Sequence, residues 1–294
     1  MIVDFSLLYL FSLQNLIHQF VNEIIFVLGL VTGALSNITS GGAGVFTTFV
    51  FTNYAGLSFQ ESVGTVLLAS TVVVMIGAIV FYRKNQVDER LSLTLGIPGF
   101  FVSLSTAYLA TQIQSSLLSR SFGAFTLVIA VLSLYRFTRA NRKKNTLQQN
   151  GGSVMLQSKG SPLVSEKPSR WAGSDPAAIG LQVELGIFLG IATGLFGVGG
   201  AGLTLAALLL IFKLKTKVML GTSLMASFFR YAGGSVGYLA YGQINIFFFV
   251  LLTVGGAIGS IVGARLVMKE SVKDSYIQLI VVGLFFFIAY EFLK

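Results

Sequence analysis

The chain has 294 residues, of which 54% are hydrophobic and 11% are charged, whereas a soluble domain carries about 25% charged residues. These proportions exclude a water-soluble globule of this size and indicate an integral membrane protein. The absence of cysteine and the single histidine, His18, exclude disulfides and thiolate or histidine clusters, so we expect no metal and no cofactor. The net charge of +9 lies mainly in loops between apolar runs, which is typical of membrane orientation and not of nucleic-acid binding.

Apolar runs follow one another along the chain from residue 24 onward. They predict an all-α polytopic membrane protein of about ten helical segments. Residues 1–20 have no basic start of the signal-peptide kind and are compatible with an interfacial segment. The runs cover residues 24–37, 43–54, 62–82, 91–110, 117–137, 180–195, 201–212, 218–239, 246–266 and 273–293.

A polar stretch, residues 138–178, interrupts the apolar pattern. It holds three of the four prolines and seven lysine or arginine residues. Such a composition is typical of a flexible linker. We therefore divide the chain into a first repeat, 21–137, a linker, 138–178, and a second repeat, 179–294.

The two sides of the linker repeat each other at a nearly constant distance. Shared glycine-rich composition could produce some of these matches, but it does not explain the matching glutamines, so we infer an internal duplication. The pairs separated by 157 residues are Gly64-Thr65 and Gly221-Thr222, Ala69-Ser70 and Ala226-Ser227, Gly77 and Gly234, Gln86 and Gln243, and Gly99 and Gly256. Upstream, the GGAG sequence of residues 41–44 recurs at 199–202.

Lysine and arginine in the loops predict the orientation, because cytoplasmic loops carry an excess of these residues. The basic linker is expected in the cytoplasm, together with loop 83–90 and the lysines near 213–217. The loops 55–61, 111–116 and 240–245 contain no lysine or arginine and are expected outside. Both termini then face outward from the plasma membrane, and the two five-segment repeats have inverted topology.

The first two segments of each repeat are short and meet at a glycine-rich break. Segments of 12–14 residues rise roughly 18–21 Å, against a hydrocarbon core of about 30 Å. Each repeat is therefore expected to open with a broken or re-entrant hairpin, which is typical of a transporter binding site. Unpaired amides at a helix N-terminus can hold an anion there, and glycine permits a close approach. The alternative is that glycine only permits tight helix packing, which we favour for Gly29, Gly33, Gly190 and Gly194.

Arg230 lies near the middle of the run 218–239, where a buried charge is costly. We expect it to bind an anion; pairing with backbone carbonyls is the alternative. The pattern G-x-G-x-x-G at 197–202 follows an apolar helix, not a strand, so a dinucleotide site is rejected. The candidate substrate-binding residues are Arg230, Asn37, Thr39, Ser40, Gly41, Gly42, Gly197, Gly199, Gly200, Thr65, Ser70, Thr222, Ser223 and Ser227.

Glu23 and Glu184 occupy matching positions near the start of the first helix of each repeat. An acidic residue there suits the helix dipole. The alternative is a role in proton coupling. We keep both interpretations open at this point.

The sequence resembles the TauE/SafE family of sulfite exporters. The resemblance rests on residues 194–202 (GLFGVGGAG), 220–227 (LGTSLMAS), Gly234 and 241–244 (YGQI). It covers almost the whole chain outside residues 1–20 and the linker, and is stronger in the second repeat. The resemblance implies movement of sulfite, a sulfonate or a related sulfur anion, driven by an ion gradient.

These observations predict a secondary transporter that moves a small anion by alternating access, coupled to a proton or to sodium. A passive anion channel is the first alternative, because inverted repeats and positive helix ends would serve it equally well. A membrane scaffold or a membrane enzyme is the second. The enzyme is disfavoured because the chain lacks cysteine, histidine clusters and an intramembrane pair of acids.

Overall fold

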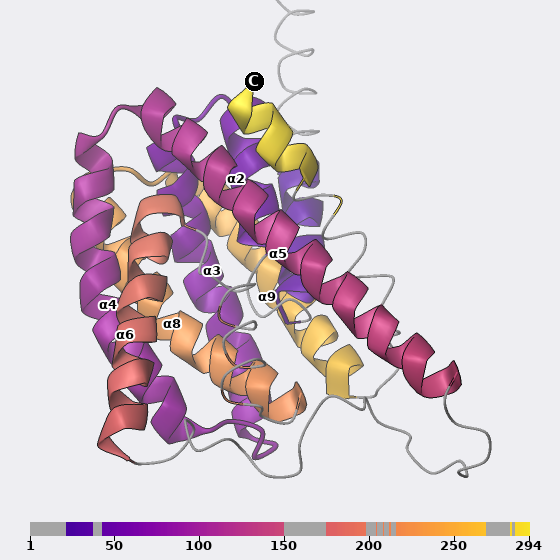
Figure 1. Ribbon diagram of the computed structural model, residues 1–294. Helices are drawn as coiled ribbons and strands as arrows, with labels where there is room; N and C mark the ends of the chain where they lie inside the picture. Colours follow the sequence, from indigo (N-terminus) through magenta and orange to yellow (C-terminus); the bar gives the residue numbers. More distant parts are fainter. Residues whose placement is uncertain are drawn as a thin grey trace, which may run out of the picture.

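The computed structural model describes residues 22–37, 43–149, 175–197, 204, 208, 212, 216–268, 283 and 286–294 (Figure 1). Within these ranges every regular element is helical, which confirms the predicted all-helical class. Residues 1–20 and the linker residues 150–174 lie outside the described part. The helices are Asn22–Asn37, α2 (Gly44–Asn53), α3 (Phe59–Tyr82), α4 (Glu89–Gln112), α5 (Ser115–Gln149), α6 (Pro176–Phe196), α8 (Thr216–Ala240), α9 (Ile246–Met268) and a last helix at 286–293.

The local sequence determines where α3 and α4 begin. The hydroxyl of Ser58 accepts a hydrogen bond from the amide of Glu61 at 3.2 Å, and a carboxylate oxygen of Asp88 accepts one from the amide of Leu91 at 3.0 Å. Both residues are N-caps, since they satisfy amides that have no partner within the helix. Glu61 and Glu89 add negative charge in the first turns, where the helix dipole is positive.

Four helices in the described part are long and apolar enough to cross a membrane: α3, α4, α6 and α9. The helices Asn22–Asn37 and Ser115–Val131 are apolar but shorter. Large apolar side chains such as Phe101, Phe188 and Phe247 are more than half exposed, as expected for a surface covered by lipid. The chain is therefore a multi-pass membrane protein.

Helix α8 has the length of a crossing helix but is less apolar than these four. Its 25 residues rise about 37 Å. It contains Arg230 and many serine, threonine and glycine residues, and packs mainly against α3 and α4. Its neighbours are protein helices, so it needs less apolar surface than a helix that faces lipid on most sides.

Helix α5 extends twelve residues beyond the predicted end of its apolar run at 137. The additional residues, 138–149, include arginine, lysine, glutamine, leucine and alanine, which favour helix regardless of polarity. Apolarity alone therefore located the membrane segment but not the end of the helix. The C-terminal helix lies against the first part of α5 (Figure 1), where Phe122 and Phe292 meet edge to face at 5.0 Å.

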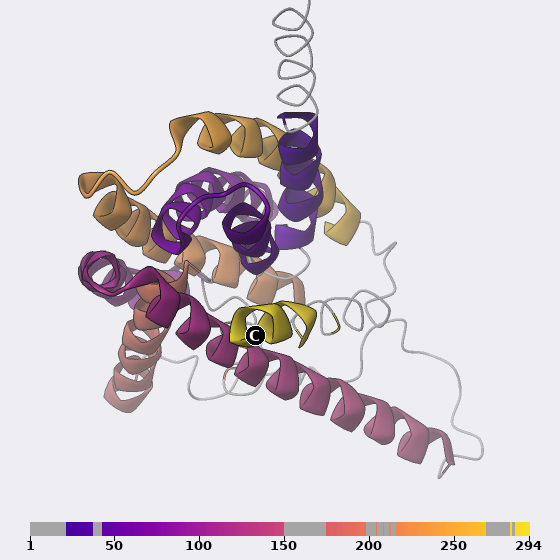
Figure 2. The same ribbon diagram turned by 90° about the horizontal axis from the view of Figure 1, so that it is seen from above.

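The helices on the two sides of the linker are interleaved. Helix Asn22–Asn37, before the linker, lies on α9, after it, and α6, after the linker, lies on α4, before it (Figure 2). A methyl group at Gly29 would stand 2.6 Å from the carbonyl oxygen of Leu252, and one at Gly190 would stand 2.8 Å from that of Gly99. Only glycine permits this approach, which agrees with the packing role predicted for Gly29 and Gly190.

Candidate functional site

Two described helices flank the first glycine-rich stretch, whose residues 38–42 lie outside the described part. One helix ends at Asn37 and α2 begins at Gly44, with Ala43 at the N-cap position and no side-chain cap. The amides at the start of α2 are thus not satisfied by a capping side chain. The predicted site residues Thr39, Ser40, Gly41 and Gly42 lie between these helices, outside the described residues.

The second break begins at Gly197, directly after α6. Gly197 has a φ of +64°, and its amide donates to the carbonyl of Thr193 at 2.8 Å, a left-handed cap that favours glycine. Gly199 and Gly200 lie outside the described residues. A methyl group at Gly44 would stand 3.9 Å from the carbonyl oxygen of Gly197, so the two breaks lie beside each other.

Arg230 is fully buried within α8. One of its guanidinium nitrogens, Nη2, donates to the hydroxyl of Ser227 at 2.8 Å and to that of Thr204 at 3.0 Å. The aliphatic part of the side chain packs on Gly99, where an added methyl would stand 2.6 Å from Cγ. The positive charge is therefore held by neutral hydroxyls in the protein interior, where an unbalanced charge is expensive.

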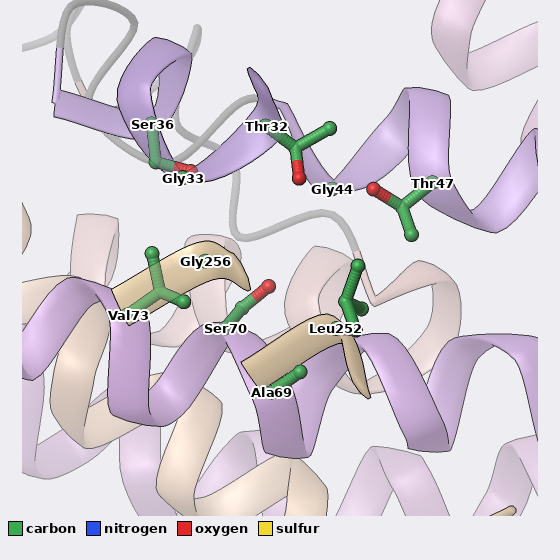
Figure 3. Close-up of a pocket in the computed structure, with 10 residues that line it drawn as sticks. All are labelled: Thr32, Gly33, Ser36, Gly44, Thr47, Ala69, Ser70, Val73, Leu252 and Gly256. Atoms are coloured by element: carbon green, nitrogen blue, oxygen red, sulfur yellow. The ribbon is translucent and has the colours of Figure 1, made fainter. Parts of the chain in front are cut away.

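A small polar cavity lies next to the first break (Figure 3). It has room for roughly one water molecule or a monatomic ion. Figure 3 shows the hydroxyls of Thr32, Thr47 and Ser70 turned toward this space. The lining residues are Thr32, Gly33, Ser36, Gly44, Thr47, Ala69, Ser70, Val73, Leu252 and Gly256. Of the residues predicted for the site, the cavity takes in Ser70; Arg230 does not line it.

Asn37, another predicted site residue, connects the first helix to α9. Its Nδ2 donates to the backbone carbonyl of Ser260 at 2.9 Å, to its hydroxyl at 3.0 Å, and to the carbonyl of Gly33 at 3.3 Å. The other side of the amide lies against Gly77, where an added methyl would overlap Oδ1. The side chain therefore fixes the end of the helix just before the break.

The hydroxyls of Thr65 and Thr222 each accept a hydrogen bond at the start of a helix on the other side of the linker. The Thr222 hydroxyl accepts from the amide of Asp88, before α4, at 2.9 Å. The Thr65 hydroxyl accepts from the amide of Asn245, before α9, also at 2.9 Å. Both threonines are fully buried, as is the remaining candidate Ser223.

Two serines outside the predicted set make a second matched pair of contacts. The hydroxyl of Ser103 donates to the carbonyl of Arg230 at 2.7 Å, and that of Ser260 donates to the carbonyl of Val73 at 2.9 Å. Ser103 and Ser260 are separated by the same 157 residues that relate Val73 to Arg230. This spacing could have identified them.

Glu23 and Glu184 are both exposed, and neither lines the cavity. The prediction that Glu184 begins its helix is wrong, because α6 starts at Pro176 and the glutamate lies two turns further on. Proline suits a first helical turn, since the amide it lacks would have no partner there. A role at the start of a helix therefore does not apply to Glu184.

The four long apolar helices and the lipid-facing apolar side chains define a multi-pass membrane protein. Residues 25–292 match the family described as "Sulfite exporter TauE/SafE". The match includes most of the chain, which therefore belongs to this family.

Three relatives from Bacillus subtilis (strain 168) carry similar names. The chain is 26% identical to "Probable membrane transporter protein YunE" over 272 residues, 88% of this chain and 95% of the relative. It is 24% identical to "Probable membrane transporter protein YdhB", over 82% of this chain and 87% of the relative. It is 22% identical to "Probable membrane transporter protein YjnA", over 82% and 89% respectively. No solved structure matches the chain significantly.

Proposed function

We propose that this protein is a secondary transporter that moves a small sulfur-containing anion, such as sulfite or a sulfonate, across the cytoplasmic membrane by alternating access. The family name supports the substrate class. The observation that carries the proposal is the juxtaposition of the two interrupted helices, because Gly44 and Gly197 lie beside each other within the protein. Discontinuous helices at matching positions are the usual binding-site architecture of secondary transporters.

The second part of the proposal is that the two repeats are inverted copies of each other. Its support is a set of contacts that recur after 157 residues with the partner repeat exchanged. The Thr65 and Thr222 contacts form one such pair, and the Ser103 and Ser260 contacts form another. The turns match as well, since Asn85 and Gly242 both have positive φ angles, of 55° and 66°.

In this proposal the anion binds where the breaks meet, near the guanidinium of Arg230. The amides of the glycine-rich stretches would donate to its oxygens, and the charge of Arg230 would balance its charge. The residues assigned to this role are Arg230, Ser227, Asn37, Thr39, Ser40, Gly41, Gly42, Gly197, Gly199 and Gly200. Thr65, Thr222 and Ser223 would support the helices around it.

The proposed orientation follows the distribution of lysine and arginine. The linker 138–178 would lie in the cytoplasm, and both termini outside the plasma membrane. The lipid bilayer would cover the exposed apolar side chains of the crossing helices. A coupling ion, either a proton or sodium, would drive transport.

The test is transport by the purified protein in proteoliposomes. Labelled sulfite, thiosulfate, taurine and chloride are presented in turn, with and without an ion gradient. We expect saturable accumulation of a sulfur anion against its gradient and its loss in Arg230→Met. The matched control is Arg120→Met, at an exposed position on α5. Non-saturating flux without accumulation would instead identify a channel, and no anion flux at all would refute transport.

A further inference from the structure

The polar cavity beside the first break combines buried hydroxyls with the absence of charge. Thr47 and Ser36 are 1% and 6% exposed. In the described part of the chain neither side chain makes a hydrogen bond, nor does that of Ser70. Buried hydroxyls normally have a partner. Two buried hydroxyls and the half-buried hydroxyl of Ser70 in one small cavity therefore point to a ligand that completes it.

The fourth hydroxyl shows which sign of charge the cavity prefers. Thr32 donates its proton to the carbonyl of Leu28 at 2.7 Å. Its oxygen can therefore present only lone pairs to the cavity, and lone pairs attract a cation. The N-terminus of α2 carries partial positive charge, which opposes this preference for a cation. The equivalent place in the second repeat indicates which of the two effects is larger.

The equivalent place in the second repeat holds a cation that is part of the protein. Thr193 donates to Leu189 at 2.7 Å, as Thr32 does to Leu28. Ser227 is the equivalent of Ser70, and it accepts a hydrogen bond from Arg230.

The residue that corresponds to Arg230 is Val73, which lines the cavity in the first repeat. Val73 packs on Gly256 as Arg230 packs on Gly99: an added methyl would stand 2.6 Å from the side chain in both places. The first repeat thus has a short apolar side chain and a cavity where the second has a guanidinium.

We propose that the cavity binds a monovalent cation, and that sodium is the ion that drives transport. This inference rests on the proposed function, since the equivalence of the two places comes from the proposed duplication. No lining residue is charged, so a divalent ion would lack the carboxylates it requires. An anion at the breaks would then lie between a fixed positive charge and an exchangeable one. Each ligand would strengthen the binding of the other by the same factor.

The test measures thermal stability of the purified protein in NaCl against choline chloride at equal ionic strength. We expect stabilisation by sodium alone, with the half-saturating concentration raised at least tenfold by Thr47→Val and Ser70→Ala. Thr71→Val is the matched control, because that hydroxyl bonds its own helix at Leu67 and does not line the cavity. Equal stability in sodium and choline, or an equal loss in the control, would overturn the proposal.

A second variant keeps the test decisive where removal of a hydroxyl unfolds the protein. Val73→Arg places a tethered guanidinium in the first repeat, as in the second. We expect a folded protein that no longer responds to sodium; an unchanged sodium response in this variant would overturn the proposal. Stabilisation by sulfite in choline with no response to sodium would identify an anion site and also overturn it. Sulfite transport that ignores sodium would contradict this inference alone, whereas sodium binding without any anion transport would contradict the proposed function and leave only the cation site.

Discussion

Replacement of Thr222 by valine tests the contacts that join the two repeats. The Thr222 hydroxyl accepts the amide hydrogen of Asp88 at 2.9 Å, and the side chain is fully buried. Valine fills nearly the same space but leaves this amide without its acceptor. An unsatisfied donor in the protein interior costs about 1–3 kcal/mol. The hydrogen bond is only partly buried, so we expect a loss of about 1–2 kcal/mol in the free energy of unfolding.

The equivalent variant, Thr65→Val, should lose a similar amount, because its hydroxyl accepts the amide of Asn245 at the same 2.9 Å. The two contacts share no residue. The double variant should therefore lose the sum of the single losses, to within about 0.5 kcal/mol. Similar losses would follow from equivalent positions in two copies of one ancestral repeat.

The measurement is reversible unfolding in mixed micelles, followed by circular dichroism as the fraction of denaturing detergent rises. Thr71→Val serves as the control, since its hydroxyl bonds only to its own helix, and it should change stability by less than about 0.5 kcal/mol. A Thr222→Val variant as stable as this control would show that the hydrogen bond to Asp88 does not stabilise the fold. A loss of stability in only one of the paired variants would show that the two contacts are not equivalent.

Three further expectations concern packing, charge and topology. Gly33→Ala should lower the free energy of unfolding by about 1–3 kcal/mol, because the added methyl would overlap the backbone of α9. Gly180→Ala is the control, since nothing lies within 4 Å of that position, and unfolding in micelles measures both variants. Arg230→Lys keeps the positive charge but loses the planar guanidinium and its paired donors, so sulfite flux in proteoliposomes should fall about tenfold or more. Unchanged flux would show that only the charge is needed. Lys84→Cys and Tyr241→Cys lie at equivalent positions 157 residues apart. In a chain without native cysteine, a membrane-impermeant thiol reagent should label only the second on intact cells, and labelling of both would contradict inverted topology.

The features that the sequence predicted well are those set by local chemistry. Long apolar runs are required wherever lipid surrounds a helix, so α3, α4, α6 and α9 were found from hydropathy. The cap at Gly197 was predictable because glycine favours the left-handed conformation that ends a helix.

The features that the sequence did not reveal depend on tertiary contacts. Thr65 and Thr222 were interpreted as site residues because their side chains are polar and their spacing repeats. Their hydroxyls accept amides from the other side of the linker, which only the arrangement of helices can show. The same holds for Thr32 and Thr47, since their common cavity requires two helices separated by the break to lie side by side.

The interleaving of the helices has a consequence for assembly in the membrane. The part of the chain on either side of the linker, inserted alone, would expose its glycine packing surface to lipid. Gly29 and Gly33 contact α9, and Gly190 contacts α4. Neither fragment of a chain cut at the linker could complete its own packing. The glycine packing surfaces on either side of the linker are therefore complete only when both sides are present.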